Sequence, residues 1–133
     1  LERRILDFIF KNNALSFASP GDSLYVGLAT AVSAAETGSL TEATFTNYAR
    51  KQVTAANWTT IGADSTDTQT AKNAANIEFD ASGGTSNTIS HVFVADASTG
   101  GNILFVGALD VSKLIADGDI FRINTGNLTI ELK

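Results

Sequence analysis

The feature that most constrains this chain is a succession of short apolar segments, each ended by glycine, asparagine, aspartate or proline. Such segments recur at roughly 8–12-residue spacing, which is typical of an antiparallel sandwich or barrel rather than of alternating strands and helices. We therefore predict a mainly β fold, a single antiparallel β-sandwich that is jelly-roll-like, with a short N-terminal helix. The clearest strand segments are 23–30, 75–80, 88–96, 102–109, 119–124 and 128–132.

The remaining segments give weaker signals. Residues 44–54 and 58–62 predict two further strands, whereas the polar stretches 31–42 and 63–74 predict loops. The near-continuous apolar run 102–109 predicts a strand buried on both faces, followed by a crossing segment at 110–118.

Two turns join strands in the second half of the chain. The segment Ala97-Ser-Thr-Gly-Gly-Asn102 predicts a hairpin connection, because two adjacent glycines supply positive φ. A second turn is expected at 124–127. In the strand 88–96, strict alternation would place Ile89, His91, Phe93 and Ala95 on one face.

Residues 1–13 carry the only clear helical periodicity. Leu1, Ile5, Phe8 and Ile9 fall at helical spacing and form an apolar stripe. An isolated helix of about three turns is marginal in water, so it must dock on something. We expect residues 1–13 to form an amphipathic helix packed on the domain, and residues 14–133 to form the β-sandwich; docking on a partner subunit is the alternative.

Composition excludes several functions. The chain has 133 residues, a net charge of −5, 17% charged residues and no cysteine. Its nine basic residues form no stripe, which argues against nucleic-acid binding. No apolar run approaches the roughly 20 residues of a membrane span, so no membrane contact is expected. Without cysteine there is neither a disulfide nor a thiolate metal ligand, and we expect no cofactor and no metal.

The candidates for catalysis are few. Gly21-Asp22-Ser23-Leu24 spells the nucleophile motif of the GDSL hydrolases, but His91 is the only histidine and no aspartate lies three residues before it. A small hydrolase using Ser23 and His91 is therefore a minor hypothesis. Asp117-Gly118-Asp119 resembles part of a calcium loop but lacks the glutamate at the twelfth position. We predict that the protein is not an enzyme.

Several ordered motifs resemble a family of small tailed-phage virion proteins of the head-decoration (cement) or tail-fibre-like β-sandwich type. The most specific lies at Asp96–Leu109, which reads D-A-x-x-G-G-N-x-L-F-x-G-A-L, and the next is Tyr48-Ala49-Arg50. The resemblance also includes Leu24-Tyr-Val-Gly-Leu-Ala-Thr30, which precedes both motifs, and Trp58 and Asn76-Ile-Glu-Phe79, which lie between them. The resemblance covers nearly the whole chain.

The resemblance implies a phage virion component with no enzymatic role. We expect a capsid decoration (cement) protein on the outer surface of the capsid, binding the major capsid protein, bridging capsomers and forming a homo-oligomer, dimer or trimer. The alternative is a tail-tip or tail-fibre-associated module that binds tail proteins or host surface glycan through loops 31–42 and 63–74, with Trp58 or Tyr48 as stacking platforms. The residues expected to contact a partner are Leu1, Ile5, Phe8, Ile9, Arg50 and Lys51.

Overall fold

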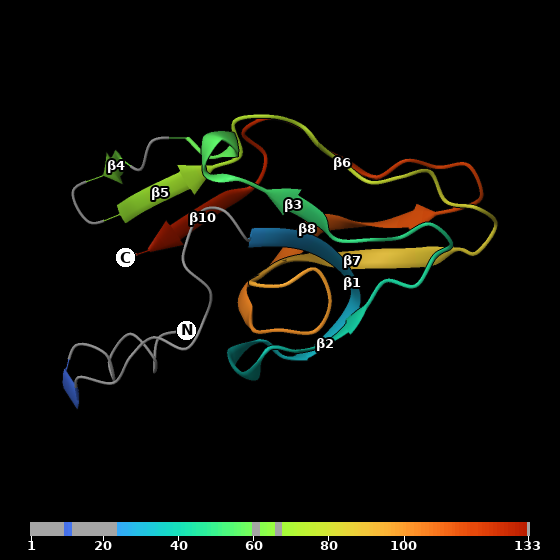
Figure 1. Ribbon diagram of the computed structural model, residues 1–133, viewed down its shortest axis with the longest axis horizontal. Helices are drawn as coiled ribbons and strands as arrows, with labels where there is room; N and C mark the ends of the chain where they lie inside the picture. The colour runs from blue at the N-terminus through green and yellow to red at the C-terminus, as the bar shows by residue number, and fades with distance from the viewer. Residues whose placement is uncertain (1–9, 12–23, 60–61, 66–67, 133) are drawn as a thin grey trace.

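The computed structural model describes residues 10–11, 24–59, 62–65 and 68–132 (Figure 1). Within them the protein is mainly β, and every strand pairing is antiparallel. The prediction of a mainly β, antiparallel fold is therefore confirmed.

The large sheet is built around two long central strands, β1 (Leu24–Ala34) and β7 (Asn87–Ala95), which pair with each other. One edge is shared by β2 (Ser39–Glu42) and β3 (Lys51–Val53), which pair with opposite halves of β1. The other edge is β8 (Ile103–Ile115), which pairs with β7. A 3-10 turn at Ala35–Thr37 joins β1 to β2.

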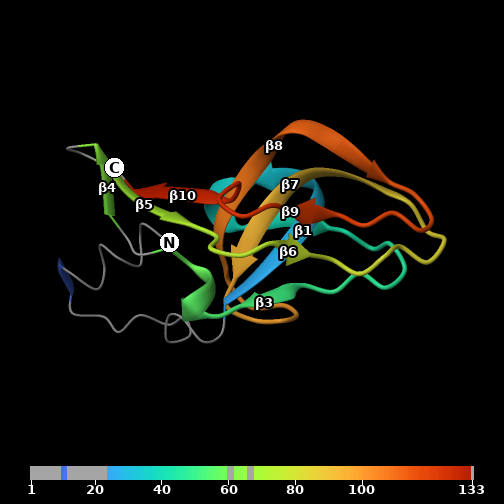
Figure 2. The same cartoon turned by 90° about the horizontal axis from the view of Figure 1, so that it is seen from above.

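Two smaller sheets complete the fold. One consists of β4 (Gly62–Ser65), β5 (Thr68–Lys72) and β10 (Thr129–Leu132), and lies beside one end of the large sheet in both views (Figures 1 and 2). The other pairs the two-residue strands β6 (Ile77–Glu78) and β9 (Arg122–Ile123). A second 3-10 turn, Ala55–Asn57, follows β3.

The main core lies between the large sheet and the β6–β9 pair. Val26 and Leu28 of β1 pack with Ile77 of β6 and Ile123 of β9 in one buried cluster. This face-to-face packing is sandwich-like, because two β layers bury their apolar faces against each other. The described strands form sheets of five, three and two strands, not the two four-stranded sheets of a jelly roll.

The opposite face of the large sheet carries a smaller cluster of Ala29, Phe93 and Ala95. Phe93 pairs with Gly27 across the strands, and its ring covers the position that a side chain at Gly27 would occupy. Glycine at this position therefore lets an aromatic ring lie flat against the neighbouring strand.

The strand β8 differs most from its prediction. It continues to Ile115, through the segment expected to cross over, and most of its residues are partly or fully exposed rather than buried on both faces. The reason is its position: β8 is an edge of the sheet, and its outer face meets solvent. Sequence gives no direct signal of edge position.

A wide bulge interrupts the pairing of β7 with β8. Between the pairs Ile89↔Lys113 and His91↔Ala108, β7 advances by two residues and β8 by five. Bulges reorient neighbouring side chains. Ile89 accordingly packs in the main core rather than with Phe93, so the predicted four-residue face of β7 is wrong at Ile89.

Four further predictions need correction. The segment 31–42, expected to be a loop, contains the end of β1, the first 3-10 turn and β2. The expected strand 44–54 is reduced to Lys51–Val53, because Asn47 adopts a positive φ of 72° and ends any extended run there. In the expected strand 58–62, Trp58 forms an isolated bridge with Asn73 and Gly62 begins β4, while residues 60–61 lie outside the described residues. The polar segment 63–74, expected to be a loop, contains parts of β4 and β5.

The remaining predictions divide into two groups. The hairpin at 97–102 and the turn at 124–127 are confirmed, with positive φ at Gly100, Gly101 and Gly126. The helix predicted for residues 1–13 lies outside the described residues except for Phe10 and Lys11, which are both helical.

Candidate functional site

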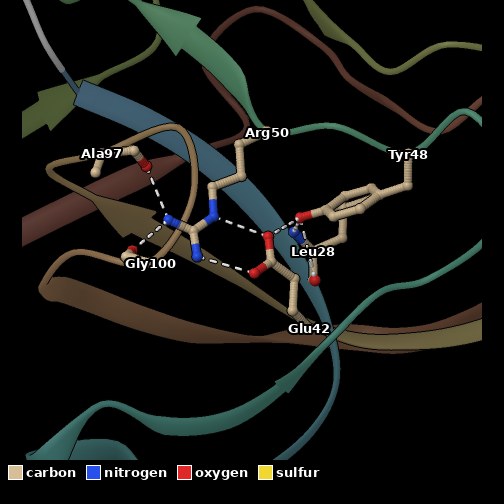
Figure 3. Close-up of polar contacts among 6 residues, drawn as sticks. All are labelled: Leu28, Glu42, Tyr48, Arg50, Ala97 and Gly100. Carbon is tan, nitrogen blue, oxygen red and sulfur yellow. Dashed lines mark hydrogen bonds and ion pairs between the residues drawn. The ribbon is translucent and has the colours of Figure 1, made fainter.

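The most tightly bonded polar cluster is centred on the Arg50 guanidinium, and we call Glu42, Tyr48 and Arg50 the clasp (Figure 3). Nε and Nη2 of Arg50 donate to the two carboxylate oxygens of Glu42, both at 2.8 Å. Nη1 donates to the carbonyls of Ala97 and Gly100, each at 2.8 Å. The Arg50 side chain is 5% exposed and that of Glu42 is 30% exposed, so the clasp is closed at Arg50 and partly open at Glu42.

Tyr48 extends the clasp to the central strand. Its hydroxyl donates to Oε1 of Glu42 at 2.8 Å and accepts from the backbone N–H of Leu28 at 3.0 Å. Its ring stacks on Phe79 with centroids 6.0 Å apart and meets Phe45 edge-on. The clasp thus connects β1, the end of β2 and the main core.

The charges of the clasp are mutually stabilised. Burial favours a higher pKa for Glu42, but hydrogen bonds from Arg50 and Tyr48 and the charge of Arg50 outweigh it, and the pKa falls below its ordinary value. Burial raises the pKa of the Tyr48 hydroxyl far above its ordinary value, and the adjacent carboxylate adds to that. The pKa of Arg50 is raised by its hydrogen bonds to Glu42.

The clasp fixes the hairpin loop between β7 and β8. Within that loop, both carboxylate oxygens of Asp96 accept hydrogen bonds from Asn102, from its backbone N–H and its side-chain amide, each at 2.7 Å. A Cβ at Gly101 would lie 2.5 Å from Asp96 Oδ1 and 2.7 Å from the Ala97 Cβ. The two motifs that carry the sequence resemblance therefore meet in space, where one anchors the other.

A groove of about 760 Å³ lies between β8 and the segment 119–129. We call it the β8 groove. Its rim carries the exposed side chains of Val111, Leu114 and Ile120. Its floor is formed by apolar residues of the core and its margin, which are Val92, Leu109, Ile115, Phe121, Ile123 and Leu128.

The β8 groove is an open side of the sandwich. Among the described residues, no strand pairs with the outer edge of β8. Phe121 and Ile123 are the most exposed members of the buried core, at 8% each, and both line the groove. An open apolar groove beside a free strand edge is typical of a protein interaction site.

The residues predicted to bind a partner have different locations. Arg50 is enclosed by the clasp and offers little surface to a partner. Lys51 lies on β3 and pairs with Asp80, Nζ to Oδ1, at 2.9 Å. Leu1, Ile5, Phe8 and Ile9 lie outside the described residues.

The described residues that were weighed for other functions do not converge on a site. Tyr48 lies in the clasp, and Trp58 packs against the main core and is half-buried, so neither ring is an open platform for sugar. Nδ1 of His91 bonds Ser90 Oγ at 2.7 Å, and Ser23 lies outside the described residues. Oδ2 of Asp119 accepts from the backbone N–H of Ala116 within a turn.

Two observations apply to the described part of the chain. It holds no group of three or more metal-binding side chains. It also holds no helix with the length and apolar character needed to cross a membrane.

Residues 1–131 match the family model described as podophage GP4 fiber I protein gp80. The chain belongs to this family. It is therefore a phage structural protein of the fibre type, located in the virion. A search of curated proteins finds no match. The match to the gp80 fibre family begins at residue 1, so it includes the amphipathic segment 1–13 as well as the β domain.

Sequence analysis missed Glu42 and the β8 groove. Glu42 lies in a segment predicted as loop, and only its sequence proximity to Arg50 hinted at a pair. The groove residues Val111 and Leu114 lie in the segment expected to cross over. Leu109, Val111 and Ile115 keep a period of two that only Lys113 and Leu114 break, and this pattern could have indicated a continued strand.

Proposed function

We propose that this protein is a structural subunit of the phage tail fibre, and that its β domain makes contacts with neighbouring fibre subunits on the outside of the particle. The observation that carries the proposal is the match of residues 1–131 to a fibre protein family. The family description names a fibre, and this favours the tail-fibre alternative over capsid decoration. The partners are then tail proteins and further copies of the chain, as a dimer or trimer.

The geometry favours an assembly role over glycan binding or catalysis. The open apolar surface lies at the β8 groove, which suits a protein partner. The two candidate platforms, Tyr48 and Trp58, are half-buried, so neither offers an open ring face for sugar stacking. The described polar cluster, the clasp, uses its hydrogen bonds to hold the hairpin loop rather than to present reactive groups. The subunit is accordingly non-enzymatic and needs no cofactor.

The test is to locate the protein on the virion. Antibodies raised against the purified chain would be applied to intact particles with gold conjugates, and a cryo-EM reconstruction would be searched for the domain. We expect label and density at the tail fibres, with unlabelled heads. Many copies distributed over the shell would overturn the proposal in favour of capsid decoration, and absence from the particle would overturn both.

A further inference from the structure

The exposed large apolar side chains of the described residues occur at two places. Three of the four, Val111, Leu114 and Ile120, are 67%, 64% and 51% exposed and border the β8 groove. The fourth, Phe10, is 78% exposed and belongs to the N-terminal segment. Exposed apolar groups gathered at few places indicate surfaces that are covered in the assembled state.

The β8 groove has the dimensions for an apolar segment of another chain. Its strand wall, Gly107–Ile115, pairs with Val92 back to Asn87 of β7, so it spans about 17 Å at roughly 3.3 Å a residue. On a helix, the apolar stripe from residue 1 to residue 9 would span about 12 Å, which fits along that wall. The volume of about 760 Å³ has room for several large side chains above a floor made of core residues.

The N-terminal segment has the complementary pattern. Leu1, Ile5, Phe8 and Ile9 form one apolar stripe in sequence, although they lie outside the described residues. The family match includes these positions, so the segment belongs to the region that this chain shares with the family. An amphipathic helix laid into an apolar groove is a recurrent mode of peptide recognition.

Charge favours the same pairing. Residues 1–13 contain three basic and two acidic residues, so they carry +1, and the remaining chain carries −6. The groove is lined by Asp110, Asp119, Lys113 and Arg122, and Arg122 is paired with Glu78. Apart from Arg122, the rim thus carries two acidic residues, Asp110 and Asp119, and one basic residue, Lys113. The basic pair Arg3-Arg4 would meet this acidic rim, and opposite charges steer association.

We infer that residues 1–13 of a second copy of this chain occupy the β8 groove, with the stripe Leu1, Ile5, Phe8 and Ile9 on its floor. The occupant comes from a second copy because Phe10 and the groove rim are both exposed in the single chain. The inference rests on the proposed function in that it names the contact between neighbouring fibre subunits.

The chain has no cysteine, so a crosslinking test needs no background substitutions. Two variants would be made of the full chain, Phe8→Cys and Val111→Cys, and the second would be isotopically labelled. Val111 is 67% exposed, so this change leaves the core intact. The two would be mixed, treated with a short bismaleimide and analysed by mass spectrometry. We expect a mixed dimer that joins residue 8 of one chain to residue 111 of the other.

The matched control is Thr99→Cys, which places a thiol on an exposed residue of the hairpin loop, outside the groove. Mixing it with Phe8→Cys should give little crosslinked product. The double variant Phe8→Cys/Val111→Cys, treated at high dilution, tests the origin of the segment. A crosslink within one chain there would overturn the assignment to a second copy, as would equal crosslinking to Thr99→Cys.

A second measurement does not depend on crosslinking. Sedimentation equilibrium should show self-association of the wild type, and Leu114→Asp should raise its dissociation constant at least about tenfold, because a buried leucine contact is lost. Thr99→Asp adds the same charge outside the groove and should leave the constant unchanged. A wild type that stays monomeric at all concentrations would overturn the inference. Labelling of the virion at its fibres would be unaffected, so the two proposals fail independently.

Discussion

Of the alanine substitutions in the clasp, Arg50→Ala should lower the free energy of unfolding the most. The substitution removes two hydrogen bonds to Glu42, two to carbonyls of the hairpin loop, and the cation that lies 5.0 Å above the Phe93 ring. Removing one partner of a buried ion pair typically costs about 3–5 kcal/mol. The Glu42 side chain is 30% exposed and can rehydrate, which places the expected loss at the lower end, about 3 kcal/mol.

The matched control is Arg122→Ala. Arg122 also pairs with a glutamate, Nε to Glu78 Oε2 at 2.6 Å, but the two side chains are 51% and 46% exposed. An exposed pair of this kind contributes about 0.2–1 kcal/mol. The two variants therefore make the same chemical change in a buried and an exposed setting.

The assay is urea unfolding followed by the fluorescence of Trp58, the single tryptophan. With an m value of about 1.5 kcal/mol/M, Arg50→Ala should lower the midpoint by about 2 M and Arg122→Ala by less than about 0.7 M. A double-mutant cycle with Glu42→Ala should give a coupling of about 1 kcal/mol or more. If Arg50→Ala costs no more than Arg122→Ala, the clasp does not stabilise the fold and the reasoning is refuted.

Three further outcomes are expected. The pKa of Glu42 is lowered on folding, so its contribution to the free energy of unfolding is present above the ordinary pKa of 4.5 and is lost as pH falls through the folded pKa. Glu42→Gln should therefore flatten the decline of the free energy of unfolding between about pH 5 and 3. An unchanged slope would contradict this. Gly101→Ala should lower the thermal unfolding midpoint more than Gly100→Ala does, since both glycines have positive φ but only a Cβ at Gly101 would lie against Asp96. Equal thermal midpoints would show that the loop relaxes. Asn73→Ala should lower the free energy of unfolding in urea by about 2–4 kcal/mol, because the Asn73 amide, in a residue that is 1% exposed, donates to two carbonyls and accepts from one backbone N–H. A loss under about 1 kcal/mol would mean that water replaces the amide as their hydrogen-bond partner.

Strands were predicted well where their own residues carry a strand pattern, and missed where only a distant partner strand defines them. The strand β7 was predicted almost to its ends, because β-branched and aromatic residues are concentrated between Thr88 and Ala95. The β4–β5 hairpin was missed, because its residues are polar or small and its pairing depends on β10, which lies far along the chain. Short polar strands carry no apolar period, so only their partners define them.

The site followed the same division. In the sequence, Tyr48 and Arg50 were singled out for other roles. Tyr48 was a candidate stacking platform, Arg50 was a candidate partner contact, and both belong to a motif of the family resemblance. Their actual role depends on Glu42 and on the carbonyls of the hairpin loop, and backbone carbonyls carry no sequence signature. The bulge in β8 likewise arises from how β7 and β8 align, which no local pattern encodes.

Sequence by itself determined the β class, the hairpin at the two adjacent glycines and the acidic character of the chain, because these depend on composition and on local backbone preference. The phage virion family was indicated by the resemblance of ordered motifs along the chain. Only the tertiary structure decided that β8 is an edge, that Arg50 faces inward, and that the sandwich stays open along the β8 groove. Each of these depends on which distant residues become neighbours, and burial is a property of neighbours rather than of the residue itself.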